Sequence, residues 1–250
     1  MPWRETDDPY RIFVSEIMLQ QTQVSRVEEK YKQFIAAFPD FATLDRASLS
    51  MVYSVWQGLG YNRRALSLKK AAKIVATEHQ GKLPDTQEAL VSLPGIGKST
   101  ASSILAFAFN RPVVFVETNI RTVFIHFFFP KKITVTDDEI LPLVEKCIYK
   151  KAPRIWYWAL MDYGTMLKKT GHDKNANSAH YVKQTRFEGS RRQLRGTILK
   201  ALLSNGCSSP DSLAKSMGKP MNVIRGVLEE LAQEGFVCLS KGRYRLADRT

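Results

Sequence analysis

One segment constrains the fold more than any other part of the chain, the run SLPGIGKSTASSILAFAF at residues 92–109. It contains three residues that a helix interior tolerates poorly, Pro94, Gly95 and Gly97. The spacing of Asp85 and Glu88 is that of a capping box, which predicts a short helix through Leu93. Beyond the glycines, apolar residues recur at helical spacing: Ala101, Ile104, Leu105 and Ala108. The segment therefore predicts two helices joined by a hairpin.

The predicted hairpin has the chemistry of a phosphate site. The backbone amides from Gly95 to Ser99 would lie unpaired at a helix N-terminus, where the helix dipole favours an anion, with Lys98 beside them. We expect this turn to hold a phosphodiester. A nucleotide-binding P-loop also ends in GKST, but it needs a glycine where this chain has Ser92 and a strand where this chain is predicted helical. An ordinary helical turn without a ligand is the other alternative.

The charge of the chain indicates the kind of partner. The formal net charge is +13 without long runs of Lys or Arg, which predicts a polyanionic partner, nucleic acid first and a membrane surface second. No apolar run approaches the ~20 residues that span a bilayer. The N-terminus also lacks the basic start followed by an apolar core that a secretion signal has. We expect a cytoplasmic, nucleoid-associated monomer that binds no membrane.

The N-terminal region predicts one long helix over residues 10–34. Its apolar residues form a predicted buried stripe: Phe13, Ile17, Val24, Val27, Tyr31 and Phe34. Glu16, Gln20 and Gln23 would share a neighbouring face of that helix, where a solvated surface is the ordinary interpretation. Residues 38–48 are predicted as a connector between this helix and further helices up to His79.

Four motifs occur in a fixed order along the chain. They are PWR at Trp3, SEIMLQQTQV at residues 15–24, WQGLGY at 56–61 and LPGIGKSTA at 93–101. Together they resemble the helix-hairpin-helix (HhH-GPD) DNA glycosylase superfamily that includes endonuclease III, and most closely its MutY-like adenine DNA glycosylases. The resemblance runs from Pro2 to about Gln184.

The resemblance implies a mostly α, two-lobed fold over residues 1–185. Its six-helix lobe would cover about 12–118, with the hairpin at 92–109, and its second lobe would combine 1–11 with 119–185. Helices are predicted at 138–150 and 154–167 in that second lobe.

The resemblance also assigns roles to individual residues. Glu16 matches the family's catalytic glutamate. Glu117 stands where the family has an aspartate that stabilises the cationic sugar, so the carboxylate is kept but is one methylene longer. Since a misplacement of ~1 Å can cost about 10²-fold in rate, this departure bears directly on activity. Trp3, Arg4 and Leu19 would line the base pocket.

The residues that would contact DNA come from several motifs. By resemblance they are Gln21, Tyr61, Gly95, Gly97, Lys98, Ser99 and Asn119. Tyr61 matches an aromatic that wedges into the base stack, although a half-buried structural tyrosine is the alternative. Relatives that also cut the strand carry a lysine where this chain has Ser99, which implies no efficient AP lyase activity.

Cofactor use departs from most of the family. Aligning GTMLK at residues 164–168 with the segment that begins the family's iron–sulfur motif places four residues at the ligand positions: Lys168, Asn175, Ser178 and Gln184. None is a cysteine, so we expect no iron–sulfur cluster and no other cofactor or metal. The cysteines at 147, 207 and 238 lack pair spacing and are predicted to be small buried hydrophobic residues.

The C-terminal region is predicted to be a separate winged helix-turn-helix domain at residues 186–250. A basic connector, residues 168–195, leads to predicted helices at 193–204, 211–217 and 221–233 and to two short strands around a Lys-Gly turn. Candidate DNA contacts are Arg225, Lys241, Arg243 and Arg245. Because Glu229, Glu230 and Glu234 put acid on the third helix, a protein-binding module is the alternative.

These features favour a monofunctional DNA N-glycosylase that acts on duplex DNA carrying a lesion or mismatch. It would flip and excise a purine, with mispaired adenine first. A glycosylase retuned to another base and a DNA-binding protein that has lost catalysis are the two alternatives.

Overall fold

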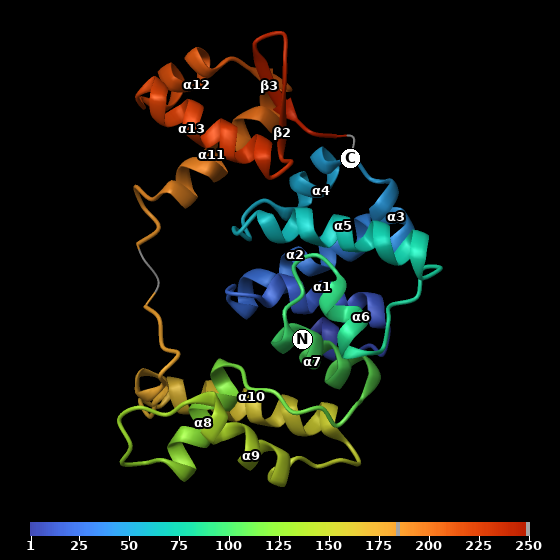
Figure 1. Ribbon diagram of the computed structural model, residues 1–250, viewed down its shortest axis with the longest axis vertical. Helices are drawn as coiled ribbons and strands as arrows, with labels where there is room; N and C mark the ends of the chain where they lie inside the picture. Colours follow the sequence, from blue (N-terminus) through green and yellow to red (C-terminus); the bar gives the residue numbers. More distant parts are fainter. Residues whose placement is uncertain (184–185, 249–250) are drawn as a thin grey trace. The chain divides into compact units, whose positions relative to one another are not determined.

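The computed structural model describes residues 1–183 and 186–248 (Figure 1). It is mostly helical, which confirms the predicted fold class. The helices are, in order, η1 (Pro2–Arg4), α1 (Pro9–Leu19), α2 (Val24–Ala37), α3 (Phe41–Arg46), α4 (Leu49–Trp56), α5 (Arg63–Glu78), α6 (Gln87–Ser92), α7 (Lys98–Phe109), α8 (Thr118–Phe128), α9 (Asp137–Cys147), α10 (Pro153–Lys169), η2 (Asn175–Asn177), α11 (Arg191–Asn205), α12 (Pro210–Met217) and α13 (Met221–Gln233). The strands are β1 (Cys207–Ser208), β2 (Val237–Ser240) and β3 (Arg243–Leu246). Within the described ranges, no helix combines the length and apolarity needed to cross a membrane.

Residue contacts divide the chain into two compact units. The first unit holds residues 1–2, 17–82 and the described residues beyond 185, and the second holds residues 3–16 and 83–183. Helix α1 crosses the division after Glu16. The predicted lobes group the helices differently, because the hairpin helix α7 packs against α10 in the second unit.

The predicted helix over residues 10–34 is two helices, α1 and α2, separated by a turn at residues 20–23. Arg64 of α5 causes the break, because its buried guanidinium donates to the carbonyl oxygens of Ile17, Met18 and Gln20 at 2.9, 2.7 and 2.5 Å. These carbonyls are the acceptors that a helix leaves unpaired at its C-terminus. Hydrophobic periodicity does not encode such a tertiary contact. The polar residues at 16, 20 and 23 consequently do not share one helix face.

Several local predictions are wrong. In the predicted stripe, Val24 is 44% exposed, whereas the other five residues are buried. The predicted connector at 38–48 contains α3, whose N-cap Asp40 accepts from the amide of Thr43 at 2.6 Å. Helix α6 is capped by Thr86, not by Asp85, whose carboxylate pairs with Arg111 at 2.6 Å.

The cysteines also differ from the prediction. Cys147 and Cys207 are exposed, and Cys238 is partly exposed. Cys147 is the last residue of α9, Cys207 lies in the edge strand β1, and Cys238 is in β2. Helix ends and edge strands leave side chains open to solvent, so the three cysteines are not core residues.

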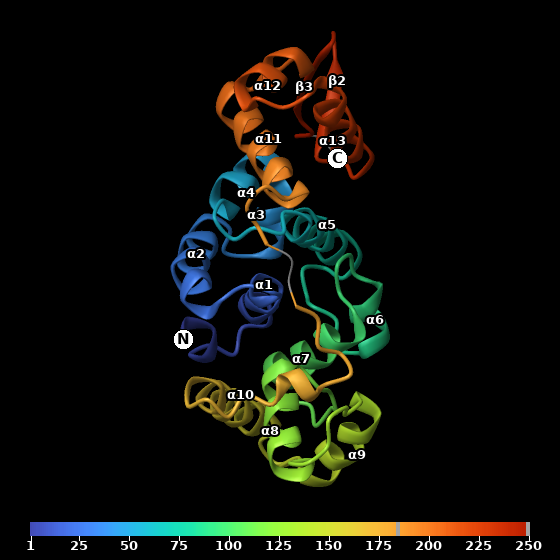
Figure 2. The ribbon, with the colours of Figure 1, turned by 90° about the vertical axis from the view of Figure 1, so that its left-hand side faces the viewer.

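The C-terminal region forms the predicted three helices and two-stranded wing (Figures 1 and 2). Lys241 and Gly242 form the turn between β2 and β3, and both have positive φ, at 48° and 73°. Strand β1 was not predicted. It pairs with β3 and gives a sheet of order β1-β3-β2.

The second unit is organised around α7, α8 and α10. Aromatic rings join α7 to α10: Phe107 stacks on Trp158 at 6.1 Å between centroids, and Phe115 lies 4.3 Å from Tyr157. Figures 1 and 2 both place α8 beside α10. This packing positions the chain segment that leads to Glu117.

Candidate active site

Glu16 is an acid of the second unit whose surroundings change its pKa. It lies on α1; the residue as a whole is partly exposed, but its carboxyl group is surrounded by protein. Burial raises the pKa of its carboxyl group to about 7; the negative charge of Glu117 raises it too, while a hydrogen bond with the Ser103 side chain and the charge of Arg4 lower it. A carboxyl group with this pKa is substantially protonated near neutral pH. Glu16 can therefore donate a proton, as a general acid must.

Ser103 is a site residue that sequence reasoning missed. It is buried on α7, and its hydroxyl lies 2.9 Å from the carbonyl oxygen of Thr100. A hydroxyl has one proton and two lone pairs. It can donate to Thr100 and accept from protonated Glu16, or turn and donate to the ionised carboxylate. One sequence signal could have found it. Ser103 is a polar residue within the apolar helix α7, where most side chains are buried.

Glu117 is the N-cap of α8. Its Oε1 accepts from the amides of Asn119 and Ile120 at 2.8 and 3.0 Å. Burial raises the pKa of its carboxyl group, while these two hydrogen bonds and the positive charges of Lys168 and Arg121 lower it. The longer side chain thus bends back to its own helix and interacts electrostatically with Glu16.

Helix α10 holds Asn119 against this cap. Lys168 donates from Nζ to Oδ1 of Asn119 at 2.7 Å. One helical turn earlier, Gly164 lies so close that a Cβ there would stand 2.4 Å from the carbonyl oxygen of Asn119. Gly164 and Lys168 are four residues apart and share a helix face. That face therefore fixes both the backbone and the side chain of Asn119, next to the Glu117 cap.

The segment before Glu117 is held by Tyr157 of α10. The Tyr157 hydroxyl donates to the carbonyl of Val113 at 2.8 Å and accepts from the amide of Phe115 at 3.4 Å. This segment has no regular structure of its own, so the tyrosine supplies the pairing that its backbone needs.

Trp3 and Arg4 lie in the same unit. Trp3 is 5% exposed, in the short helix η1. Arg4 donates to Asp162 at 2.8 Å, and its Cζ lies 5.5 Å from the Trp158 ring centroid. Arg4 also acts on the Glu16 carboxyl through its charge.

The hairpin forms as predicted between α6 and α7. Gly95 has φ +81°, which favours glycine, whereas Gly97 is extended and caps α7 without a side chain. A Cβ on Gly97 would meet no atom within 4 Å, so its backbone is open to a ligand. Lys98 and Ser99 are exposed, and the Ser99 hydroxyl lies 3.5 Å from the carbonyl of Val116. The predicted row of open amides lacks Ile96, which donates to Leu93.

In the first unit, one cation joins two turns. The Arg64 guanidinium that binds the end of α1 also donates to Thr22 Oγ1 at 2.8 Å and to the carbonyl of Gly60 at 3.2 Å. Burial lowers the pKa of Arg64 to about 10, so the group stays charged at neutral pH. Sequence reasoning missed Arg64, which in the sequence is one of two adjacent arginines.

The predicted DNA-contact residues of the first unit lie on these turns. The exposed Gln21 has φ +54°, and Leu19, predicted to line the base pocket, ends α1 just before it. Tyr61 is partly exposed and has φ +44°, an uncommon conformation for a residue with a side chain. The guanidinium carbons of Arg64 and Arg192 each lie 5.5 Å from the Tyr61 ring centroid.

The candidates of the C-terminal domain are all exposed: Arg225, Lys241, Arg243 and Arg245. Two acidic residues at the C-terminal end of α13 form salt bridges with arginines of the first unit. Glu230 binds Arg191 at 2.5 Å, and Glu234 binds Arg195 and Arg63, each at 2.5 Å. These two acids therefore have a structural role.

The residues at the family's cluster positions do not fit an iron–sulfur cluster. Such clusters are held by thiolates, whereas this chain has the ammonium of Lys168, bound to Asn119, the amide of Asn175 and the hydroxyl of the buried Ser178. The fourth predicted position, Gln184, lies outside the described residues.

The second unit thus holds a glycine hairpin between two helices and two carboxylates that interact electrostatically. The chain belongs to the HhH-GPD superfamily of base excision DNA repair proteins, whose family model matches residues 14–148.

Known proteins resemble the chain over about half to two thirds of its length. It is 37% identical over 171 residues to the adenine DNA glycosylase of Buchnera aphidicola subsp. Baizongia pistaciae, covering 67% of this chain and 48% of the relative. The adenine DNA glycosylase of Mycobacterium tuberculosis is 40% identical over 124 residues, which are 49% of this chain and 41% of the relative. A solved thermostable thymine-DNA glycosylase matches with a TM-score of 0.59 and 26% identity, over 66% of this chain and 78% of that one. The chain spans about half or less of the length of these two curated relatives.

Proposed function

We propose that the protein is a monofunctional DNA N-glycosylase of base excision repair that excises mispaired adenine from duplex DNA. The observation that carries the proposal is the pair of interacting carboxylates, Glu16 of α1, which lies on the motif that resembles the family and is hydrogen-bonded to Ser103, and Glu117 at the N-cap of α8. Burial raises the pKa of Glu16 to about 7, as a proton donor requires. The 37–40% identity to adenine DNA glycosylases supports adenine as the base.

The proposed reaction uses the two carboxylates in different protonation states. Adenine leaves poorly until a ring nitrogen is protonated, and Glu16 supplies that proton. The glycosidic bond then breaks and positive charge develops on the sugar. Ionised Glu117 stabilises this charge, and water completes the hydrolysis. Burial raises the pKa of Glu117 overall; the hydrogen bonds from the α8 amides and the charge of Lys168 oppose that rise and favour the ionised form that this role requires.

Contacts to DNA would come from the hairpin and from the two turns joined by Arg64. The amides around Gly97 and the ammonium of Lys98 would bind a phosphate, while Tyr61 and Gln21 would enter the base stack once the target is flipped out. We further propose that the protein acts as a monomer without an iron–sulfur cluster and, with Ser99 in place of a lysine, without efficient strand cleavage. Its site of action would be the nucleoid.

A second candidate is a glycosylase for another base, which the likeness to the thymine-DNA glycosylase structure favours. The experiment is a panel of duplexes, each with one mispair or damaged base, incubated with the protein and then cleaved with alkali. We expect alkali-dependent cleavage at mispaired adenine and no cleavage without alkali. Release of thymine or uracil alone would favour the second candidate, and binding without any base release would indicate that catalysis has been lost.

A further inference from the structure

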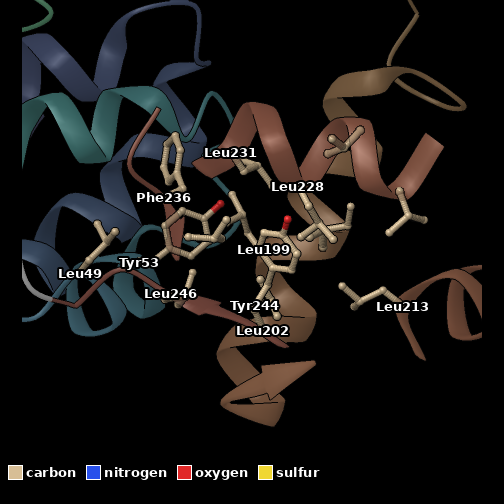
Figure 3. Packing of buried hydrophobic residues seen from close by; sticks show 14 of the residues in the cluster. Leu49, Tyr53, Leu199, Leu202, Leu213, Leu228, Leu231, Phe236, Tyr244 and Leu246 are labelled. Carbon is tan, nitrogen blue, oxygen red and sulfur yellow. The ribbon is translucent and has the colours of Figure 1, made fainter. Parts of the chain in front are cut away.

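The C-terminal domain is packed onto the helices that carry the Tyr61 turn. One hydrophobic cluster joins Leu49 and Tyr53 of α4 and Leu66 of α5 to residues of α11, α12, α13 and the sheet (Figure 3). The Tyr53 and Phe236 rings meet edge to face at 6.4 Å between centroids. Burial of this apolar surface fixes the domain to its neighbours.

Polar contacts set the orientation at the edge of this cluster. Arg63, two residues after Tyr61, pairs with Glu234 at 2.5 Å. Asp248, which follows β3, accepts from the amide and hydroxyl of Ser50 at 2.7 and 2.6 Å. Glu234 also binds Arg195 of α11 at 2.5 Å, so the N-terminal part of α11 is held close to residues 61–63.

The first five residues of α11 include three arginines, Arg191, Arg192 and Arg195. Cations near a helix N-terminus oppose the helix dipole, so their presence calls for another reason. Arg191 and Arg195 bind the acids of α13. Arg192 donates from Nη1 to the hydroxyl of Tyr61 at 2.6 Å, and its Cζ lies 5.5 Å from the Tyr61 ring centroid.

Tyr61 is thus held at both ends. Its backbone, with φ +44°, continues the turn whose Gly60 carbonyl is bound by Arg64, while its hydroxyl is bound by Arg192 from another domain. A side chain that enters a base stack loses rotamer freedom when it binds. Holding it beforehand lowers that cost and raises affinity.

We propose that Arg192 is a positioning residue that orients the Tyr61 ring for insertion into DNA, and that the C-terminal domain thereby forms part of the surface that engages the duplex at the flipped base. This inference rests on the proposed function, in which Tyr61 enters the base stack. The family model ends at residue 148 and assigns nothing to this domain.

The test is a double-mutant cycle on the full chain with Arg192→Ala, Tyr61→Phe and the double variant. Two quantities are measured: the affinity for a duplex with a stable abasic-site analogue, and the fluorescence of 2-aminopurine placed beside that site. Tyr61→Phe keeps the ring and removes only the hydroxyl. Arg191→Ala is the matched control, because it removes the same charge one residue away.

A hydrogen bond from a charged donor predicts a loss of affinity on the order of tenfold for Arg192→Ala. The fluorescence rise on binding should fall in parallel. Tyr61→Phe should have a similar effect, and the double variant should be little worse than either single one. Arg191→Ala should stay within about threefold of wild type.

Independent, multiplicative losses in the double variant would overturn the inference, as would an equal loss with Arg191→Ala. Because binding to an abasic-site analogue needs no catalysis, the cycle can be read even in a protein that releases no base. Failure of the proposed function and failure of this inference are therefore distinguishable. Should Arg192→Ala not fold by circular dichroism, Arg192→Gln with Tyr61→Phe provides the same cycle.

Discussion

Lys168 donates a hydrogen bond to the side chain of Asn119 at 2.7 Å. This hydrogen bond and the close approach of Gly164 to Asn119 pack α10 against the N-terminus of α8. This contact acts on Glu117, whose pKa the charge of Lys168 lowers.

Lys168→Met should raise the pKa of Glu117, because a neighbouring positive charge is lost. Glu117 must be ionised to stabilise the sugar cation, so the low-pH limb of the single-turnover rate of base release should move to higher pH. Lys168→Arg should largely retain the wild-type profile, and Lys169→Met, next along the helix, is the control. An unchanged low-pH limb in Lys168→Met would show that this lysine has only a structural role.

Ser103→Ala should move the high-pH limb of the rate of base release. The Ser103 hydrogen bond lowers the pKa of Glu16 from what burial alone would give. Since Glu16 acts as an acid, base release should decline above about pH 7 in wild type, and the decline should begin at higher pH in Ser103→Ala. Ser102→Ala, also buried on α7, is the matched control. If the rate declines at the same pH in wild type and in both variants, Ser103 does not affect the pKa of Glu16.

Arg64→Met should destabilise the fold. The substitution leaves several buried carbonyls without a donor, and we expect a loss of about 3 kcal/mol or more in the free energy of unfolding. Arg63→Met removes an arginine from the surface and should cost about 1 kcal/mol or less. Urea unfolding of both variants provides the comparison. Equal midpoints would contradict the role given to Arg64 in holding the two turns.

Elements that depend on contacts between residues close in sequence were predicted well, and those that depend on distant residues were not. The glycine hairpin, the wing turn at Lys241 and the helices of the C-terminal domain follow from local turn chemistry and periodicity, and were predicted nearly to the residue. The break between α1 and α2 was not, because it depends on Arg64, more than 40 residues away.

The candidate site shows the same contrast. Glu16 and Glu117 were chosen through motifs, while Ser103, Lys168 and Arg192 act through contacts across 49 to 131 residues of sequence. A single sequence has no signal for such pairs. The cysteines show a different error. They were predicted to be buried because cysteine is buried on average, but they lie at a helix end and in short strands, where side chains are open to solvent.

Glu117→Asp should lower the rate of base release. The glutamate bends back to the amides of its own helix, and a shorter carboxylate at this cap would stand farther from the developing charge. Glu117→Ala should cost about 10² to 10³ in rate, the usual contribution of one group that stabilises a transition-state charge. A faster Glu117→Asp would indicate that the site has drifted from an aspartate ancestor.

Glu16→Gln tests whether this chain breaks glycosidic bonds through the proposed acid. The amide preserves the shape of the side chain but has no acidic proton to give. In a single-turnover assay on a duplex with mispaired adenine, wild type should release the base, and Glu16→Gln should bind the duplex with similar affinity and release none within the same time. Base release by Glu16→Gln at the wild-type rate would remove Glu16 from the mechanism.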